Sequence, residues 1–219
     1  MRDLERTREK ILSAARTEFC AKGLAGARTA AIARRAGVNK RMLFYCFGSK
    51  EELYNEILRR KSAESARFLE SVSDEVGAAL VQWDGNCRED PDWVRLLEWE
   101  ALESGAGPVV IEETRRRLFK AALAKLRRAQ EKGNVSLGLD LTQLFLSLVA
   151  VTVFPYAFPQ LVRLISGKEP SDADFVARRS EFLHWLGERL ALAETGVQAA
   201  PSNRRPNARV ESGIRRSAR

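Results

Sequence analysis

Histidine and cysteine, which supply many catalytic bases, nucleophiles and transition-metal ligands, are scarce in this sequence. The 219 residues include one histidine and three cysteines, at positions 20, 46 and 87. A single histidine leaves no Ser/His/Asp or Cys/His/Asn set on the usual pattern, and the irregular cysteine spacing does not fit a zinc site. No glycine-rich phosphate-binding loop is present either. We therefore expect a protein that is not an enzyme and that uses no metal or other cofactor.

Signals for β-strands and for secretion are also nearly missing. Few stretches alternate apolar and polar residues, and the N-terminus is charged from Arg2 onward, unlike a secretory leader. Three irregularly spaced cysteines are compatible with reduced thiols in a cytoplasmic protein. The sequence thus predicts an all-α, cytoplasmic protein.

Long uncharged runs are rare, with one exception. Residues 141–162, LTQLFLSLVAVTVFPYAFPQLV, carry no charge, and 22 residues are long enough to span a membrane. Two prolines, two glutamines, two threonines and a serine lower the apolarity of this run. A helix that is apolar all round can instead be buried on every side. We expect a buried helix of the core here and no membrane anchor.

Positive charge is plentiful and unevenly spread. The formal net charge is +8, and residues 1–60 hold 14 Lys/Arg against seven Asp/Glu. Residues 61–196 hold 17 against 21, and residues 197–219 hold six against one. Two basic ends around a slightly acidic middle suit contact with a polyanion such as DNA. Ordinary charge asymmetry without such a partner is the alternative.

The segment from Thr29 to Lys50, TAAIARRAGVNKRMLFYCFGSK, has the pattern of two short helices joined by a tight turn. Gly37 supplies a residue that accepts a positive φ at the turn. Asn39 is suited to cap the second helix, which begins with two cations and so suits the major groove of DNA. The inward positions of the two helices are Ile32, Ala33, Ala36, Leu43 and Phe47.

Apolar periodicity predicts helices along the rest of the chain. Gly23 is expected to close the first helix, and Ser49-x-x-Glu52 is a capping box that opens a long helix. Whether this helix ends near Val72 or runs on toward a break at Gly85-Asn86 stays open. The other predicted helices are Leu4–Lys22, Asp92–Leu102, Ile111–Lys132, Leu141–Phe154 and Phe175–Ala193.

Residues 4–60 resemble the TetR family of bacterial transcriptional regulators. The resemblance lies in Thr29-x-x-Ile32-Ala33, Ala36-Gly37-Val38 and Asn39-Lys40-x-x-Leu43-Phe44-Tyr45-x-Phe47, followed by Ser49-Lys50-Glu51-Glu52-Leu53. It implies an N-terminal three-helix, helix-turn-helix DNA-binding domain at residues 1–48. A helical ligand-binding and dimerisation domain would follow at residues 49–196. Residues 197–219 are rich in Ala, Ser, Arg, Asn and Pro and poor in apolar residues, so their composition predicts a basic, disordered tail. The last two long helices would pair with those of a second subunit.

The predicted DNA contacts follow from the second helix of the motif and from the resemblance. Lys40 and Arg41 are the sharpest candidates for base or phosphate contact. The resemblance implies phosphate contacts from Lys50 and from Thr29, which could also act as a helix cap. The family usually has tyrosine at the position of Phe44, and histidine or tyrosine at the position of Cys46. Phe44 has no hydroxyl to donate and a thiol is a weak donor, so Tyr45 and Arg41 could supply the contacts that these two residues do not make. The full predicted set is Thr29, Asn39, Lys40, Arg41, Met42, Phe44, Tyr45, Cys46 and Lys50.

The resemblance further implies a pocket for a small-molecule effector in the helical body. Aromatic residues are candidate lining positions, although residues of this type more often belong to the core. They are Trp93, Trp99, Phe119, Phe154, Tyr156 and Phe158. The expected function is a homodimeric regulator, usually a repressor, that an unidentified effector releases from operator DNA. The alternative is a DNA-binding regulator controlled by a protein partner, without a small-molecule site.

Overall fold

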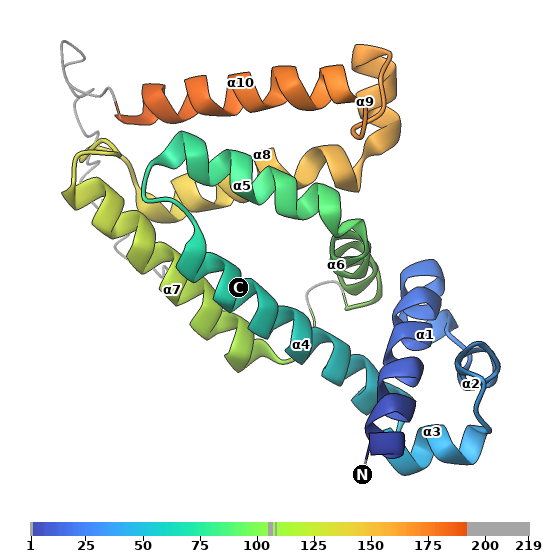
Figure 1. Ribbon diagram of the computed structural model, residues 1–219. Coiled ribbons are helices and arrows are strands. Elements are labelled where there is room, and N and C mark those ends of the chain that lie inside the picture. The colour runs from blue at the N-terminus through green and yellow to red at the C-terminus, as the bar shows by residue number, and fades with distance from the viewer. Residues whose placement is uncertain (1, 105–106, 108, 192–219) are drawn as a thin grey trace, which may run out of the picture.

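The protein folds entirely into helices over the part of the chain that its computed structural model describes, residues 2–104, 107 and 109–191. Ten helices and no strand occur among these residues (Figure 1). The predicted all-α class is therefore confirmed. The basic tail expected at residues 197–219 lies outside the described residues.

The N-terminal helices form a small unit, called the head below. It consists of α1 (Arg2–Gly26), α2 (Thr29–Ala36) and α3 (Lys40–Phe47), with the first turns of α4 (Lys50–Ser71) closing its core. The Tyr54 ring of α4 packs edge-on against Phe19 of α1, with 5.1 Å between ring centroids. One hydrophobic cluster thus joins the head to a helix that continues beyond it. The large, fully buried members of this cluster are Ile11, Phe19, Ile32, Leu43 and Leu53.

The local signals of the helix-turn-helix act as predicted. Gly37 is in the left-handed region with φ of 68°, and the Asn39 side chain accepts from the backbone N of Met42 at 2.8 Å. Ser49 Oγ accepts from the backbone N of Glu52 at 2.9 Å and so caps α4. Gly23 also has a positive φ of 68°, although helical hydrogen bonding resumes beyond it to Gly26. Short-range side-chain chemistry therefore sets the boundaries of these helices.

The long helix ends near Val72, and the break expected at Gly85-Asn86 is wrong. α4 stops at Ser71, and α5 runs from Val76 to Glu89 through both of those positions. The Glu75 carboxylate caps α5 by accepting from the backbone N of Gly77 and Ala78. An internal glycine costs a helix only about 1 kcal/mol, and α5 is supported by packing against α8 and α10.

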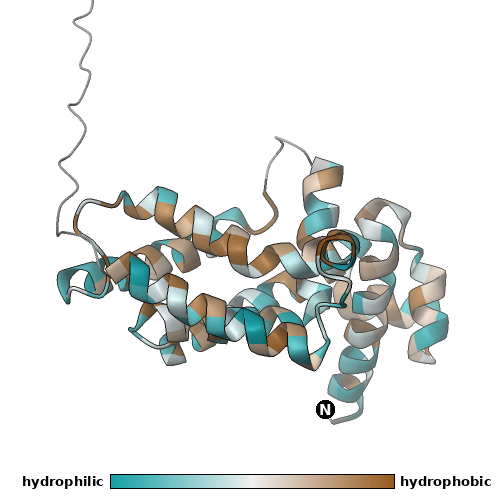
Figure 2. Ribbon diagram, turned by 90° about the horizontal axis from the view of Figure 1, so that it is seen from above, coloured by the Kyte–Doolittle hydropathy of each residue, from teal (hydrophilic) through white to brown (hydrophobic). Residues whose placement is uncertain are grey.

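The remaining helices form the body. α6 (Pro91–Ser104) packs on α1 and α8, and α7 (Glu112–Glu131) packs on α4 and α8 (Figure 1). α8 (Leu141–Ala157) passes through Pro155 beyond its predicted end, and α9 (Pro159–Ser166) begins at the next proline. α10 (Ala173–Ala191) lies along α5. Apolar and polar residues mix along these ribbons in Figure 2, as in amphipathic helices that bury one face.

The backbones of α5 and α10 touch where two glycines face each other. A Cβ atom placed on Gly187 would lie 2.2 Å from the backbone N of Gly77 and 2.4 Å from its Cα. One placed on Gly77 would lie 2.9 Å from the Cα and carbonyl oxygen of His184. Neither position has room for a side chain, so these two glycines set the separation of the helices.

The uncharged run at residues 141–162 is divided between two helices. Among the described residues, no single helix is both long and apolar enough to cross a membrane. Only α8 and α9 taken together reach that length and composition, and they are bent by 85° relative to each other.

Candidate functional site

The outer face of α3 presents cations and aromatic side chains at the end of the head. Leu43 and Phe47 point into the head core, which leaves Lys40, Arg41, Phe44 and Tyr45 exposed on the opposite side. Tyr45 is 75% exposed, and Lys40 Nζ lies 5.6 Å from the centroid of the Phe44 ring. Neither Lys40 nor Arg41 forms an ion pair within the described ranges, so both charges are available to an anionic partner. These four residues are called the α3 face below.

Met42 and Cys46, which were predicted to contact DNA, lie to the side of this face. Both are half-buried against the head core. The carbonyl oxygen of Cys46 accepts from Arg8 of α1, whose guanidinium lies 4.4 Å from the Phe47 ring centroid. The structure therefore gives Met42 and Cys46 a packing role that holds α3 against α1. Arg8 was missed because nothing in the local sequence pairs it with α3.

Thr29 and Lys50 lie on either side of the link between α1 and α2. Thr29 is the first residue of α2 and Arg28 is its N-cap, so Thr29 is not the cap itself. Lys50 Nζ donates to the carbonyl oxygens of Leu24 at 2.7 Å, Ala27 at 3.3 Å and Ala25 at 3.4 Å. The ammonium group thus satisfies the end of α1, and a phosphate at Lys50 would have to share it with these carbonyls.

The same link is held from the body by α6. The Glu103 carboxylate accepts from the backbone N of Leu24 at 3.1 Å and of Ala25 at 3.0 Å. Trp99 Nε1 donates to the carbonyl oxygen of Cys20 at 3.0 Å. Trp99, a predicted pocket residue, is therefore a contact between body and head and does not line the cavity described below.

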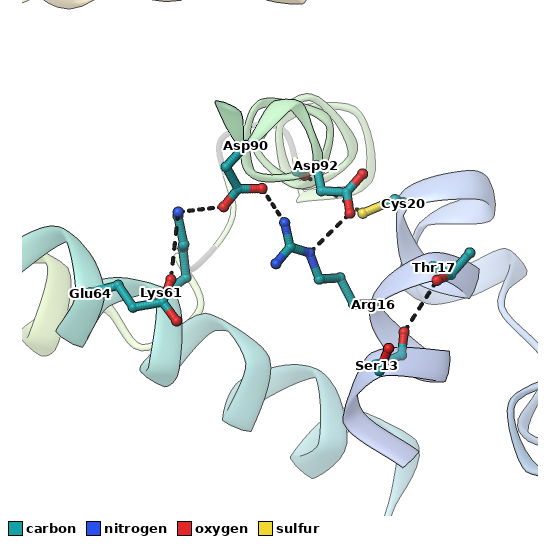
Figure 3. Close-up of polar contacts among 8 residues, drawn as sticks. All are labelled: Ser13, Arg16, Thr17, Cys20, Lys61, Glu64, Asp90 and Asp92. Carbon is teal, nitrogen blue, oxygen red and sulfur yellow. Dashed lines mark hydrogen bonds and ion pairs between the residues drawn. The ribbon is translucent and has the colours of Figure 1, made fainter. Parts of the chain in front are cut away.

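An ionic cluster joins α1, α4 and the start of α6 (Figure 3). Arg16 of α1 pairs with Asp90 and, through Nε at 3.0 Å, with Asp92, while Lys61 of α4 pairs with Asp90. These four residues are called the junction below. Burial, together with the nearby Asp92, raises the pKa of the Cys20 thiol to about 12, so this cysteine is a protonated packing residue at neutral pH.

A cavity of about 230 Å³ opens between α4, α5, α6, α7 and α8. Of the six predicted pocket residues, Trp93 and Phe119 line it, and Phe119 packs edge-on against Phe145 with 6.2 Å between centroids. The sequence signal that was missed is the pair Ser62 and Ser65 in α4. These small residues lie on the same buried stripe as Leu58 and Leu69, and both line the cavity.

The other predicted aromatic residues lie elsewhere. The Tyr156 hydroxyl donates to Asp84 at 2.8 Å, and burial together with this hydrogen bond raises the pKa of Tyr156. Phe154 and Phe158 are 42% and 44% exposed at the corner between α8 and α9, with 5.3 Å between their ring centroids. Aromatic content alone thus did not separate cavity, core and surface positions.

Each charged side chain in the cavity wall has an opposite charge beside it. Arg115 Nη1 donates to Glu100 Oε1 at 2.7 Å, and both side chains are largely buried. Lys125 Nζ lies 3.6 Å from Asp74 Oδ1 and also donates to the carbonyl oxygen of Leu69 at 3.3 Å. Arg115 is therefore neutralised by Glu100, whereas Asp74 is shared between Lys125 and, at 2.6 Å, Lys132. No group of three metal-ligating side chains occurs over the described residues.

Apolar side chains are also exposed on the outer faces of the last two long helices. Phe182 and Trp185 of α10 stack with 5.9 Å between ring centroids and 27° between their planes. Leu146 of α8 is likewise exposed. A contiguous apolar patch on the surface of a protein often marks an interaction site.

Comparisons with known proteins agree with this arrangement. Residues 11–57 match the model of bacterial regulatory proteins of the tetR family, and residues 83–189 match that of the tetracyclin repressor-like C-terminal domain. The HTH-type transcriptional repressor SCO4008 of Streptomyces coelicolor is 30% identical over 173 residues, which cover 79% of this chain and 90% of that protein. The repressor NicS of Pseudomonas putida is 34% identical over 110 residues, which cover 46% of this chain and 51% of NicS.

The similarity extends to solved structures. SCO4942 of Streptomyces coelicolor, a proposed transcriptional regulator, superposes with a TM-score of 0.70 at 23% identity. The match covers 82% of this chain and 97% of that one, so the two proteins share a fold over almost their full described length.

Proposed function

Because the chain belongs to the TetR family of bacterial regulatory proteins, we propose that it is a homodimeric repressor released from operator DNA by a small-molecule effector. The family consists of transcriptional regulators that bind operator DNA and form dimers. The observation that carries the proposal is the path of α4. Its first turns complete the head core, and its later turns supply Ser62, Ser65 and Leu69 to the cavity wall.

On the DNA side, the proposal assigns recognition to the α3 face. Lys40 and Arg41 stand at the N-terminal end of α3, where side chains of a recognition helix reach base edges and phosphates. Tyr45 adds an exposed hydroxyl. Thr29, Asn39 and Lys50 would contact phosphates of the DNA backbone. In a dimer the two heads would enter successive major grooves, about 34–36 Å apart or a multiple of that distance.

Replacing Arg41 with alanine should weaken operator binding by about tenfold or more, because a lost guanidinium contact to guanine is worth about 1–3 kcal/mol. Cys46→Ala is the matched control on the same helix, and it should change affinity by less than threefold because Cys46 packs inward. The measurement is a fluorescence anisotropy titration on an operator fragment found by footprinting the DNA upstream of the gene. Equal affinity of wild type and Arg41→Ala would contradict the assignment.

The second subunit would dock on the outer faces of α8 and α10. Phe182, Trp185 and Leu146 supply an apolar surface there, and two helices from each subunit would form a four-helix bundle. This arrangement agrees with the dimers formed by the family.

Coupling between cavity and head would run through α4 and α6. Trp93 lines the cavity and directly follows Asp92, which holds Arg16 of α1 in the junction. An effector that binds one head orientation more tightly would shift the population toward it, by no more than its differential affinity. Release follows if that orientation fits the operator poorly.

Arg16→Gln should separate effector binding from operator release, since it removes both ion pairs between α1 and Asp90 and Asp92. We expect ligands identified by thermal shift to bind this variant within threefold of wild type. Half-release of the operator, followed by anisotropy, should require at least fivefold more ligand, as expected from a coupling of about 1–3 kcal/mol. Arg95→Gln is the control, because the one ion pair of Arg95 with the described residues is with Glu98 of the same helix. An unchanged release curve for Arg16→Gln would count against the junction.

Control by a protein partner is the second candidate, and the surface of α9 favours it. Leu164 and Ile165 are about four-fifths exposed there, which is costly without a partner. The thermal-shift screen distinguishes the two candidates, because only a small-molecule effector stabilises the isolated protein.

A further inference from the structure

We propose that the cavity binds an uncharged, largely apolar molecule carrying one hydroxyl or carbonyl group, and that Ser62 hydrogen-bonds this group. The inference deepens the proposed function, on which it rests, by naming the chemical class of the effector. It comes from one polar atom in the wall and from the charges around it.

The polar atom is the hydroxyl oxygen, Oγ, of Ser62. Only 3% of the surface of Ser62 is exposed. Its Oγ has no hydrogen-bond partner in the described part of the chain. Serine and threonine in helices commonly donate to the carbonyl four residues back. Thr152, in the same cavity wall, does so to Leu148 at 3.0 Å. Buried hydroxyls are normally satisfied, so Ser62 is suited to a partner that arrives with a ligand.

The position of Ser62 explains why a ligand could reach it. The stripe of α4 that faces the body reads Leu58, Ser62, Ser65 and Leu69, at helical spacing. Two small residues between two leucines leave space beside α4 that larger side chains would fill. The rest of the wall is mainly hydrocarbon and aromatic, so it suits the apolar part of a ligand. Examples on the facing helices are Leu118, Phe145 and Leu148.

The charges of the wall exclude an ionised ligand. A carboxylate would have to displace Glu100 from Arg115, and an ammonium would have to displace Arg115 from Glu100. At the other end of the wall, Lys125 already donates to the carbonyl oxygens of Leu69 and Val72. Asp74 there pairs with Lys132 at 2.6 Å, so an ion would have to displace existing partners at this end as well. An ion that displaced neither partner would be desolvated without a counter-charge, which is strongly unfavourable. A hydroxyl or carbonyl meets neither obstacle, and both can pair with a serine hydroxyl.

A matched eight-carbon series tests the inference on the full chain in the absence of DNA. The probes are 1-octanol, 2-octanone, octanoate and octylammonium, titrated against tryptophan fluorescence because Trp83 and Trp93 line the cavity. We expect 1-octanol and 2-octanone to bind at least tenfold more tightly than either ion. Ser62→Ala should weaken 1-octanol binding at least fivefold while keeping the thermal stability of wild type, because it removes an unsatisfied hydroxyl. Ser147→Ala on α8, which removes a hydroxyl that is bonded to the backbone carbonyl of Gln143 and lies outside the cavity wall, should change binding less than twofold.

The possible results separate this inference from the proposed function. Tighter binding of octanoate or octylammonium, no saturable binding of 1-octanol, or equal 1-octanol affinity of wild type and Ser62→Ala would each overturn the inference. None of these results bears on whether some other effector releases the operator. Selective, Ser62-dependent binding of 1-octanol that leaves the operator complex intact would instead support the inference and count against effector-controlled release.

Discussion

Gly187→Ala should lower the free energy of unfolding by about 3 kcal/mol, at the upper end of the usual cost of overpacking. The added methyl would meet the backbone N and Cα of Gly77 at 2.2 and 2.4 Å. A clash with a flexible side chain can be relieved by a rotamer change, but here the obstacle is the backbone of α5. Relief therefore requires α5 and α10 to move apart, which also loosens the contacts between them.

Gly85→Ala is the matched control for this experiment. Gly85 lies inside α5, and the nearest foreign atom to its added Cβ would be Nη2 of Arg88 at 3.8 Å. Alanine there should stabilise the protein by about 0.5–1 kcal/mol, because glycine is a poor helix former. Urea unfolding followed by circular dichroism, at one fixed protein concentration, measures both variants. Similar effects of the two substitutions would show that α5 and α10 are not in backbone contact.

Asp84→Ala should cost about 3–5 kcal/mol of stability, since it leaves the Arg179 charge buried without its partner. Asp84 is 4% exposed and accepts from Arg179 Nε of α10 and, at 2.8 Å, from the Tyr156 hydroxyl of α8. One carboxylate thus ties three helices together. The double variant Asp84→Leu, Arg179→Met should recover much of the loss, because replacing a whole buried pair by apolar residues is often neutral.

An exposed ion pair provides the comparison for Asp84. Arg117 Nε lies 3.2 Å from Glu113 Oε1 on α7, and the two side chains are 75% and 67% exposed. Glu113→Ala should therefore lower the free energy of unfolding by less than about 0.5 kcal/mol. The readout is again the urea midpoint at equal slope. If Asp84→Ala were as mild as Glu113→Ala, the interior network would be contributing no more than a surface pair.

The head was predictable because its structure follows from neighbouring residues. Asn39 and Ser49 cap helices whose first turns they begin, and the inward positions Leu43 and Phe47 follow from helical spacing. The end of α4 was left open because its successor is capped by Glu75, a residue type rarely chosen for that position. Lys50 was expected at a phosphate, and its bonds to the α1–α2 link depend on a fold that brings residues about 25 positions apart together.

The candidate sites were predictable to different extents for the same reason. The exposure of Lys40, Arg41 and Tyr45 follows from the period of a single helix. Trp99 and Tyr156 were assigned to the pocket by their aromatic rings, but their N–H and O–H groups found partners on helices more than 70 residues away. The sequence feature that indicates the cavity is the pair of small residues Ser62 and Ser65 on α4, and the positions of aromatic residues do not reveal it.

The path of α4 also has a thermodynamic consequence for the proposed mechanism. If effector and operator act on one shared helix, the factor by which the effector weakens DNA binding must equal the factor by which DNA weakens effector binding. The DNA-bound protein is then a less sensitive detector than the free protein. The effector concentration that triggers release must exceed the dissociation constant measured without DNA, and the difference grows as the operator becomes tighter or more abundant. The operator sequence would thereby help to set the threshold of its own regulator.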